Sequence, residues 1–154
     1  MSCSDFVAAA LVALFAATPA HAVLGGAVET VDADAARMAG VRRVAAGPQA
    51  NVRVHSIVRA DGSAVHEYVS ASGVVFAIAW HTRFKPDLAA LLGAQAPAYA
   101  AAARRALAAP GIRRHVALEE GDLVVHATAH LNAFAGRAYL KSLLPAGTPP
   151  DAIR

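Results

Sequence analysis

The sequence predicts an α+β fold: an antiparallel β-meander of three strands and a C-terminal hairpin, covered on one face by one or two helices. Two turn signals, Asp61-Gly62 and Ser72-Gly73, separate three runs of alternating apolar and polar residues, the pattern of β-hairpins. The alternation gives the meander one apolar face, which another element must cover. From Pro86 onward, leucines recur at helical spacing and supply that cover.

An apolar run, Phe6 to Ala17, lies near the start of the chain. A helix that spans a bilayer needs about 20 apolar residues, so this run is too short for a stable anchor. Ala20 and Ala22 form the small-x-small pattern that signal peptidase accepts. We expect residues 1–22 to be a signal peptide and the protein to be exported, to the periplasm or out of the cell. A buried N-terminal helix is the alternative, because no Lys or Arg precedes the run.

Removal of residues 1–22 on export would limit what the rest of the chain can use for its stability. Cys3 is the only cysteine of the 154 residues, and its removal would leave a protein without disulfides that relies on its apolar core. We expect residues 23–50 to be irregular, with one or two helical turns ended by Gly40, and residues 51–154 to form a single α+β domain. The formal net charge of +3 says little about partners, since the chain is simply rich in Arg and Ala.

The predicted strands cover residues 51–58, 63–70 and 74–81. With two-residue turns, Val58 pairs with Val65 and Glu67 with Ile78. The face that needs cover then carries Val52, Val54, Val58, Val65, Val69, Val74, Phe76, Ile78 and Trp80.

Helices are predicted from Pro86 to Gly93 and from Pro97 to Leu107, because proline suits the first turn of a helix and glycine its end. Residues 115–118 and 122–131 predict the C-terminal hairpin, and residues 137–144 predict a short helix before Pro145. The inward face of the hairpin would carry Leu123, Val125, Ala127, Ala129 and Leu131.

Several blocks of the chain resemble a known family. They are HEYVSASGVVFAIAW, PDLAALLG and AFAGRAYLKSLLPAGTPPDAIR, together with VLGG directly after the predicted signal peptide. They are similar to the bacterial exported family catalogued as domain of unknown function 2844, over nearly the whole chain beyond residue 22. The resemblance implies export in a Gram-negative bacterium and one small domain. It carries no catalytic or binding residues over to this chain.

Glu67 is the unusual residue of the meander, because the predicted register places its carboxylate among valines. A buried charge is costly unless it is paired, and perturbed carboxylates cluster at functional sites. Glu67 with His66 or His81 could form an acid–base pair. We favour the other interpretation, in which a bulge or a longer turn directs Tyr68 inward and Glu67 outward.

The remaining residues indicate no metal or cofactor site. His126 and His130 would share a helix face, but on the predicted strand they are about 13 Å apart, too far for one zinc ion. No serine lies in a G-x-S-x-G context and no glycine loop suits a phosphate. Nucleic acid is not an expected partner, because the aromatic residues fall mainly at core positions.

Four guanidinium groups, Arg104, Arg105, Arg113 and Arg114, flank the turn at Pro110-Gly111. They form a candidate binding patch for an anionic envelope polymer or a lipid headgroup, although Arg near a helix end also complements its dipole. Two functions remain open. One is a non-catalytic binding or accessory module of the envelope, acting on a polymer, a membrane surface or another exported protein. The other is a small periplasmic enzyme that uses Glu67 and a histidine.

The cleavage site makes a direct prediction. Because Ala20 and Ala22 frame it, the exported protein should begin at Val23. The intact mass of the protein from the envelope fraction would check this, and full-length protein in the cytoplasm would contradict it.

Overall fold

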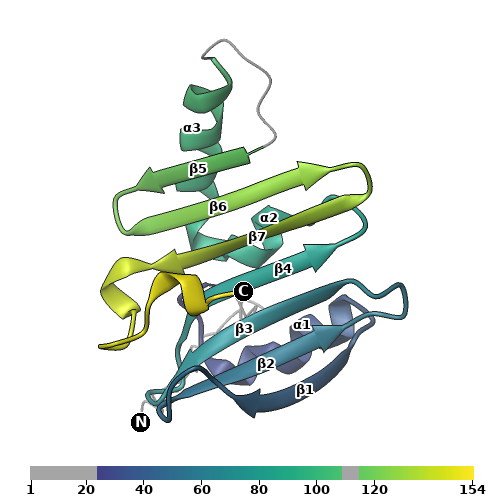
Figure 1. The fold of residues 1–154 in the computed structure, drawn as a ribbon, viewed down its shortest axis with the longest axis vertical. Helices are drawn as coiled ribbons and strands as arrows, with labels where there is room; N and C mark the ends of the chain where they lie inside the picture. Colours follow the sequence, from purple (N-terminus) through teal and green to yellow (C-terminus); the bar gives the residue numbers. More distant parts are fainter. Residues whose placement is uncertain (1–23, 109–114) are drawn as a thin grey trace, which may run out of the picture.

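The computed structural model describes residues 24–108 and 115–154, and it has an α+β fold (Figure 1). Seven antiparallel strands form one sheet in the order β1-β2-β3-β4-β7-β6-β5. The strands are β1 (Val41–Ala46), β2 (Val52–Val58), β3 (Ala64–Ser70), β4 (Val75–Thr82), β5 (His115–Glu120), β6 (Leu123–His130) and β7 (Ala133–Leu140). The helices are α1 (Val31–Arg37), α2 (Leu88–Leu92) and α3 (Ala96–Leu107). All three helices cover one face of the sheet, and the segment after β7 crosses the other face (Figure 1).

The first hairpin pairs one residue away from the predicted register. Val58 pairs with Ala64, and Ile57 pairs with Val65. The turn is longer than two residues, because the Arg59 N–H donates to the Ser63 carbonyl at 2.9 Å. A shift of one residue exchanges the faces of a strand, so β2 directs His55 and Ile57 toward the helices, while its valines face the other way.

The second hairpin keeps the predicted pair of Glu67 with Ile78. A bulge after Tyr68 then inserts one extra residue into β4 and turns Phe76 to the face away from the helices. There Phe76 packs against Tyr68, with ring centroids 6.3 Å apart, and joins a cluster that contains Ile153. The prediction that Phe76 shares the helix-covered face is therefore wrong, whereas the placement of Trp80 beside Leu91 and Leu92 is confirmed.

The predicted helix over residues 137–144 is wrong, because this stretch forms the second half of β7 and a short 3-10 turn, Lys141–Leu143. β7 inserts between β4 and β6 and joins the meander and the hairpin into one sheet. Its last three residues are all buried, so no alternation marks it as a strand. Leu131, predicted to be inward, is 90% exposed in the turn between β6 and β7.

Residues 24–50 also belong to the fold, contrary to the expected irregular segment. α1 packs Val31 and Ala35 against the sheet, and β1 forms the edge strand beside β2. The expected helical turns are α1, but β1 was not predicted, since Val41 and Val44 are exposed and no alternation marks a buried face. No helix within residues 24–108 and 115–154 is long and apolar enough to cross a membrane.

Trp80 gives a test of the face assignment. It is 3% exposed in the core under the helices, so Trp80→Ala should lower the free energy of unfolding by about 3–5 kcal/mol. Phe84→Ala is the matched control, because Phe84 is 68% exposed and its loss should cost about 0.5 kcal/mol or less. Denaturant unfolding measures both, and equal losses would contradict the assignment.

Candidate functional site

Glu67 is fully buried on the helix-covered face of β3, with 0% of its surface exposed. The favoured prediction, that it points outward, is wrong. The longer turn between β2 and β3 changes the register of β2 against β3, and the bulge follows Tyr68 rather than preceding Glu67. Tyr68 is also buried, because the C-terminal segment covers the opposite face of the sheet. The structure therefore holds a carboxyl group in its apolar core.

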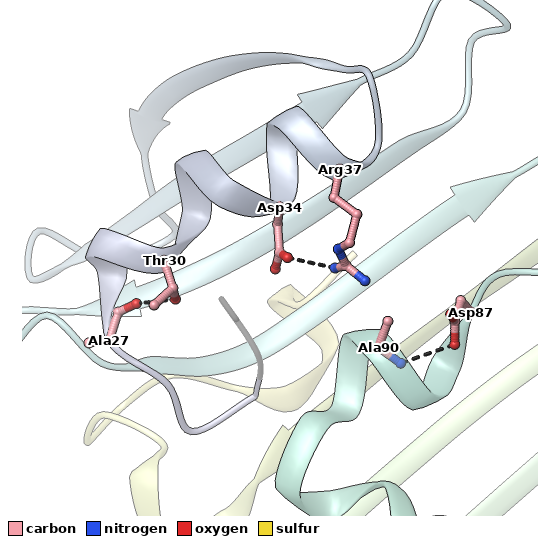
Figure 2. Close-up of polar contacts among 6 residues, drawn as sticks. All are labelled: Ala27, Thr30, Asp34, Arg37, Asp87 and Ala90. Atoms are coloured by element: carbon pink, nitrogen blue, oxygen red, sulfur yellow. Dashed lines mark hydrogen bonds and ion pairs between the residues drawn. The ribbon is translucent and has the colours of Figure 1, made fainter. Parts of the chain in front are cut away.

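α1 places a second carboxyl group over Glu67. Asp34 is fully buried, and its carboxylate accepts a hydrogen bond from the Arg37 guanidinium at 2.6 Å (Figure 2). Burial, and after it the negative charge of Asp34, raise the pKa of Glu67 to about 8, against the opposing effects of Arg37 and Arg42. At neutral pH the protonated form of Glu67 is favoured. A neutral Glu67 avoids the large cost of two buried negative charges.

The histidine on the same face as Glu67 is His55, which pairs with it directly across β2 and β3. His55 is 3% exposed. Burial lowers its pKa, and the nearby Arg42 lowers it further, so the neutral imidazole is favoured. Sequence reasoning missed His55 because the predicted register put it on the opposite face; the cue was a polar residue within a run of apolar residues.

The predicted acid–base partners are not brought together. His66 and His81 both point to the face away from Glu67, since neighbouring residues of a strand face opposite ways. His66 is half-buried and lies 2.7 Å from the Ser56 hydroxyl through its Nδ1 atom; burial lowers its pKa. His81 is exposed. Neither imidazole can exchange a proton with the Glu67 carboxyl.

Glu67, Asp34, Arg37 and His55 form the buried polar cluster. A cavity of about 340 Å³ opens beside it, between α1 and α2. Figure 2 shows Arg37 extending from α1 toward the start of α2, where the Ala90 N–H donates to the Asp87 carboxylate at 3.0 Å. The lining includes three cations, Arg37, Arg59 and Lys85, and an apolar part made by Met38, Val65, Phe84, Pro86, Ala90 and Leu91. Asp87 is the single acidic residue among the described residues of the lining. The cavity therefore offers apolar contact and excess positive charge.

The predicted arginine patch is only partly described. Arg104 and Arg105 lie in the last turn of α3, and Arg105 forms an ion pair with Glu120 of β5. Arg113 and Arg114 lie outside the described residues. The pair formed by Arg105 connects α3 to the edge of the sheet, which is a structural role.

His126 and His130 lie four residues apart on β6, and both are exposed. Within the described part of the chain, no group of three or more His, Cys, Asp or Glu residues is placed to hold a metal ion.

The raised pKa of Glu67 predicts how stability depends on pH. Between its ordinary value of 4.5 and about 8, the unfolded chain releases the Glu67 proton while the folded chain keeps it. The contribution of Glu67 is thus present below pH 4.5 and is lost as pH rises toward 8, by on the order of 4 kcal/mol. His55 has the opposite effect on stability. Because its pKa is lowered in the folded chain, the free energy of unfolding decreases as the pH falls and the unfolded chain takes up the proton first.

Comparison with Glu67→Gln isolates the effect. The variant cannot ionise at this position, so its stability relative to the wild type should rise steadily from pH 5 to pH 8 in urea unfolding. Glu29→Gln is the control, because Glu29 is exposed and its difference from the wild type should stay constant. A constant difference for Glu67→Gln as well would show that Glu67 has an ordinary pKa.

Comparison with known proteins identifies the family. No curated protein and no solved structure matches the chain. The family model described as "Protein of unknown function (DUF2844)" matches residues 20–153, which is most of the chain. The resemblance seen in the sequence blocks is thereby confirmed, and the chain belongs to the DUF2844 family.

Proposed function

We propose that this protein is an exported, non-catalytic binding module that takes a small organic anion in the cavity between α1 and α2. The observation that carries the proposal is the arrangement of Arg37, Arg59 and Lys85 around a cavity whose remaining surface is mainly apolar. Ligand sites are typically concave and largely apolar, with a few placed polar groups. A volume of about 340 Å³ lies within the range of such sites, which begins at roughly 300 Å³.

The three cations of the cavity differ in how far they are already engaged by carboxylates, and so in how available they are to bind a ligand. Arg37 is engaged by the buried Asp34 carboxylate at 2.6 Å, so it fixes one wall. Among the described residues, Arg59 makes only a long contact of 4.0 Å, with Asp61. The Asp61 carboxylate also accepts the Ser63 N–H at 2.8 Å. Arg59 and Lys85 are therefore the groups proposed to bind the anionic end of the ligand, with Met38, Val65 and Leu91 against its apolar part.

The buried polar cluster supports binding rather than catalysis. A general base must come within hydrogen-bond reach of the proton that it removes, and Glu67 has no exposed surface. His55 is almost as deeply buried. The cluster instead places α1 on the sheet, and Arg37 extends from it to the cavity wall. We propose that its role is to hold that wall in position.

A second candidate function is a small enzyme that uses Glu67 with His55 rather than with His66 or His81. The specific observation in its favour is the pairing of a neutral imidazole with a carboxyl group of pKa about 8, as acid–base sites require. This candidate needs a movement of α1 that exposes Glu67. An enzyme of this kind would lose its activity in Glu67→Gln, whereas the proposed binding module would keep its ligand.

We further propose that the protein acts outside the cytoplasm, as the apolar run and cleavage pattern of residues 1–22 indicate. Its ligand would then be an anionic component of the bacterial envelope or a compound that passes through it. The partner is proposed by its chemistry alone, an apolar body that ends in a carboxylate or phosphate.

Octanoate is a suitable probe, because it combines an apolar chain with one carboxylate. Calorimetry at pH 7.5 should show that the wild type binds octanoate and that Arg59→Gln/Lys85→Gln binds it at least about tenfold more weakly, since one charge-assisted hydrogen bond is worth 1.5–3 kcal/mol. The matched control is Arg53→Gln/Arg104→Gln, which removes two exposed charges away from the cavity and should bind octanoate as the wild type does.

Uncharged 1-octanol separates the apolar contribution from the anionic one. Equal affinity for octanol and octanoate would contradict the proposed role of the two cations. Absence of octanoate binding at millimolar concentration would overturn the cavity as the binding site.

A further inference from the structure

A second cavity, of about 160 Å³, lies next to the cavity between α1 and α2. Its lining is mainly apolar and includes Trp80, Leu88, Tyr99, Val116, Ala127 and Phe134. Lys85 and Pro86, in the segment between β4 and α2, line both cavities. Val65 lines the first cavity and pairs directly with Trp80, which lines the second. The two cavities are therefore adjacent.

One row of paired residues connects the two cavities. Its members, in order across the sheet, are Val65, Trp80, Gly136, Ala127 and Val116. Residues paired across neighbouring strands share a face, and Trp80 packs with the leucines of α2, so the row lies on the helix-covered face. The side chain that β6 contributes to the row is the small Ala127, which leaves space between the sheet and the helices.

The two cavities together extend across several strands. Arg59 follows β2 and lines the first cavity, whereas Ala127 of β6 lines the second. β3, β4 and β7 lie between β2 and β6, and neighbouring strands are about 4.8 Å apart, so the span is roughly 19 Å. Carbon–carbon bonds are about 1.5 Å long, so octanoate would reach about half of this span. A ligand that fills both cavities is longer than octanoate.

The charges and the apolar surface are distributed unequally between the two cavities. Lys85 is the single cation among the described residues that line the second cavity, and none of those residues is acidic. Phe84 lines the first cavity and is 68% exposed, directly beside the segment that both cavities share. Exposed apolar surface at a groove is typical of a ligand site. An apolar chain would cover this ring on its way from one cavity to the other.

We propose that the ligand is a long unbranched alkyl chain with an anionic head, whose head lies at Arg59 and Lys85 and whose tail passes Phe84 into the second cavity, beside Trp80. This inference rests on the proposed function, because it extends the ligand of the same site. The small volume of the second cavity suits a narrow chain rather than a ring system. Each methylene group that enters an apolar site tightens binding by about fourfold, so the tail would supply most of the affinity.

Dodecanoate is the probe, and octanoate is its short counterpart. Calorimetry at pH 7.5, below the concentration at which dodecanoate aggregates, should show that the wild type binds dodecanoate at least about tenfold more tightly than octanoate. Dodecyl phosphate in place of dodecanoate distinguishes a phosphate head from a carboxylate head, and a gain over the matching eight-carbon compound supports the proposal with either head.

Trp80 reports where the tail lies, because it is the single tryptophan of the chain and bromine quenches indole fluorescence only at close range. Dodecanoate brominated on its terminal carbon should quench Trp80 at saturation. Dodecanoate brominated next to its carboxylate should quench it much less, since its bromine would lie near Arg59. This measurement uses the wild type, so it does not depend on whether a variant folds.

Ala127→Leu tests the second cavity directly, because the larger side chain would fill it. This variant should bind dodecanoate no more tightly than the wild type binds octanoate. Ala117→Leu is the matched control, since Ala117 is exposed on the neighbouring strand β5 and faces the other side of the sheet; it should keep the full gain. The free energy of unfolding of each variant verifies that its fold is intact.

The outcomes separate this inference from the proposed function. Binding of octanoate without any gain for dodecanoate would overturn the inference and leave the first cavity as the site. Equal quenching by the two brominated compounds, or a full gain in a folded Ala127→Leu variant, would also overturn it, because the tail would then lie elsewhere. Absence of binding by both octanoate and dodecanoate would overturn the proposed function and this inference together.

Discussion

The contact between Trp80 and Gly136 connects the two halves of the molecule. Trp80 is in β4, the last strand of the N-terminal meander, and Gly136 is its partner in β7. A Cβ atom at Gly136 would lie 2.3 Å from Cζ2 of Trp80, so only glycine lets the indole lie flat across β7. The indole ring then packs in the same core cluster as Leu91 and Leu92 of α2. A side chain at position 136 would therefore push β7 away from β4, where the two parts of the sheet meet.

The interior under α1 contains polar groups. Over β2 and β3 the short helix α1 supplies Asp34 and Arg37, and the strands supply His55 and Glu67. Each of the buried ionisable groups is held near neutrality, either by an ion pair or by a shifted pKa. The cluster fixes α1 on the sheet, and α1 in turn forms one wall of the cavity.

Sequence reasoning predicted the fold class, β2 to β6 and the helices, because these elements have a regular period or clear end signals. It failed for β7, whose buried end interrupts the alternation, and for β1, whose edge position exposes its valines. The turn between β2 and β3 is longer than predicted, so His55 lies on the same face as Glu67. The buried polar cluster could therefore not be predicted from the sequence. The cavity could not be predicted either, because Arg37, Arg59 and Lys85 come from three separate segments.

The central position of β7 in the sheet affects the order in which the parts of the sheet can form. A central strand formed by residues 133–140 means that the sheet cannot close until nearly all of the preceding residues have been synthesised. The hydrogen bonds between Tyr68 and the backbone of Arg154 span 86 residues, so the second face of the sheet closes later still. Folds with such distant contacts form slowly. For the proposed export, a slow start would leave time for the unfolded chain to cross a membrane before it acquires structure.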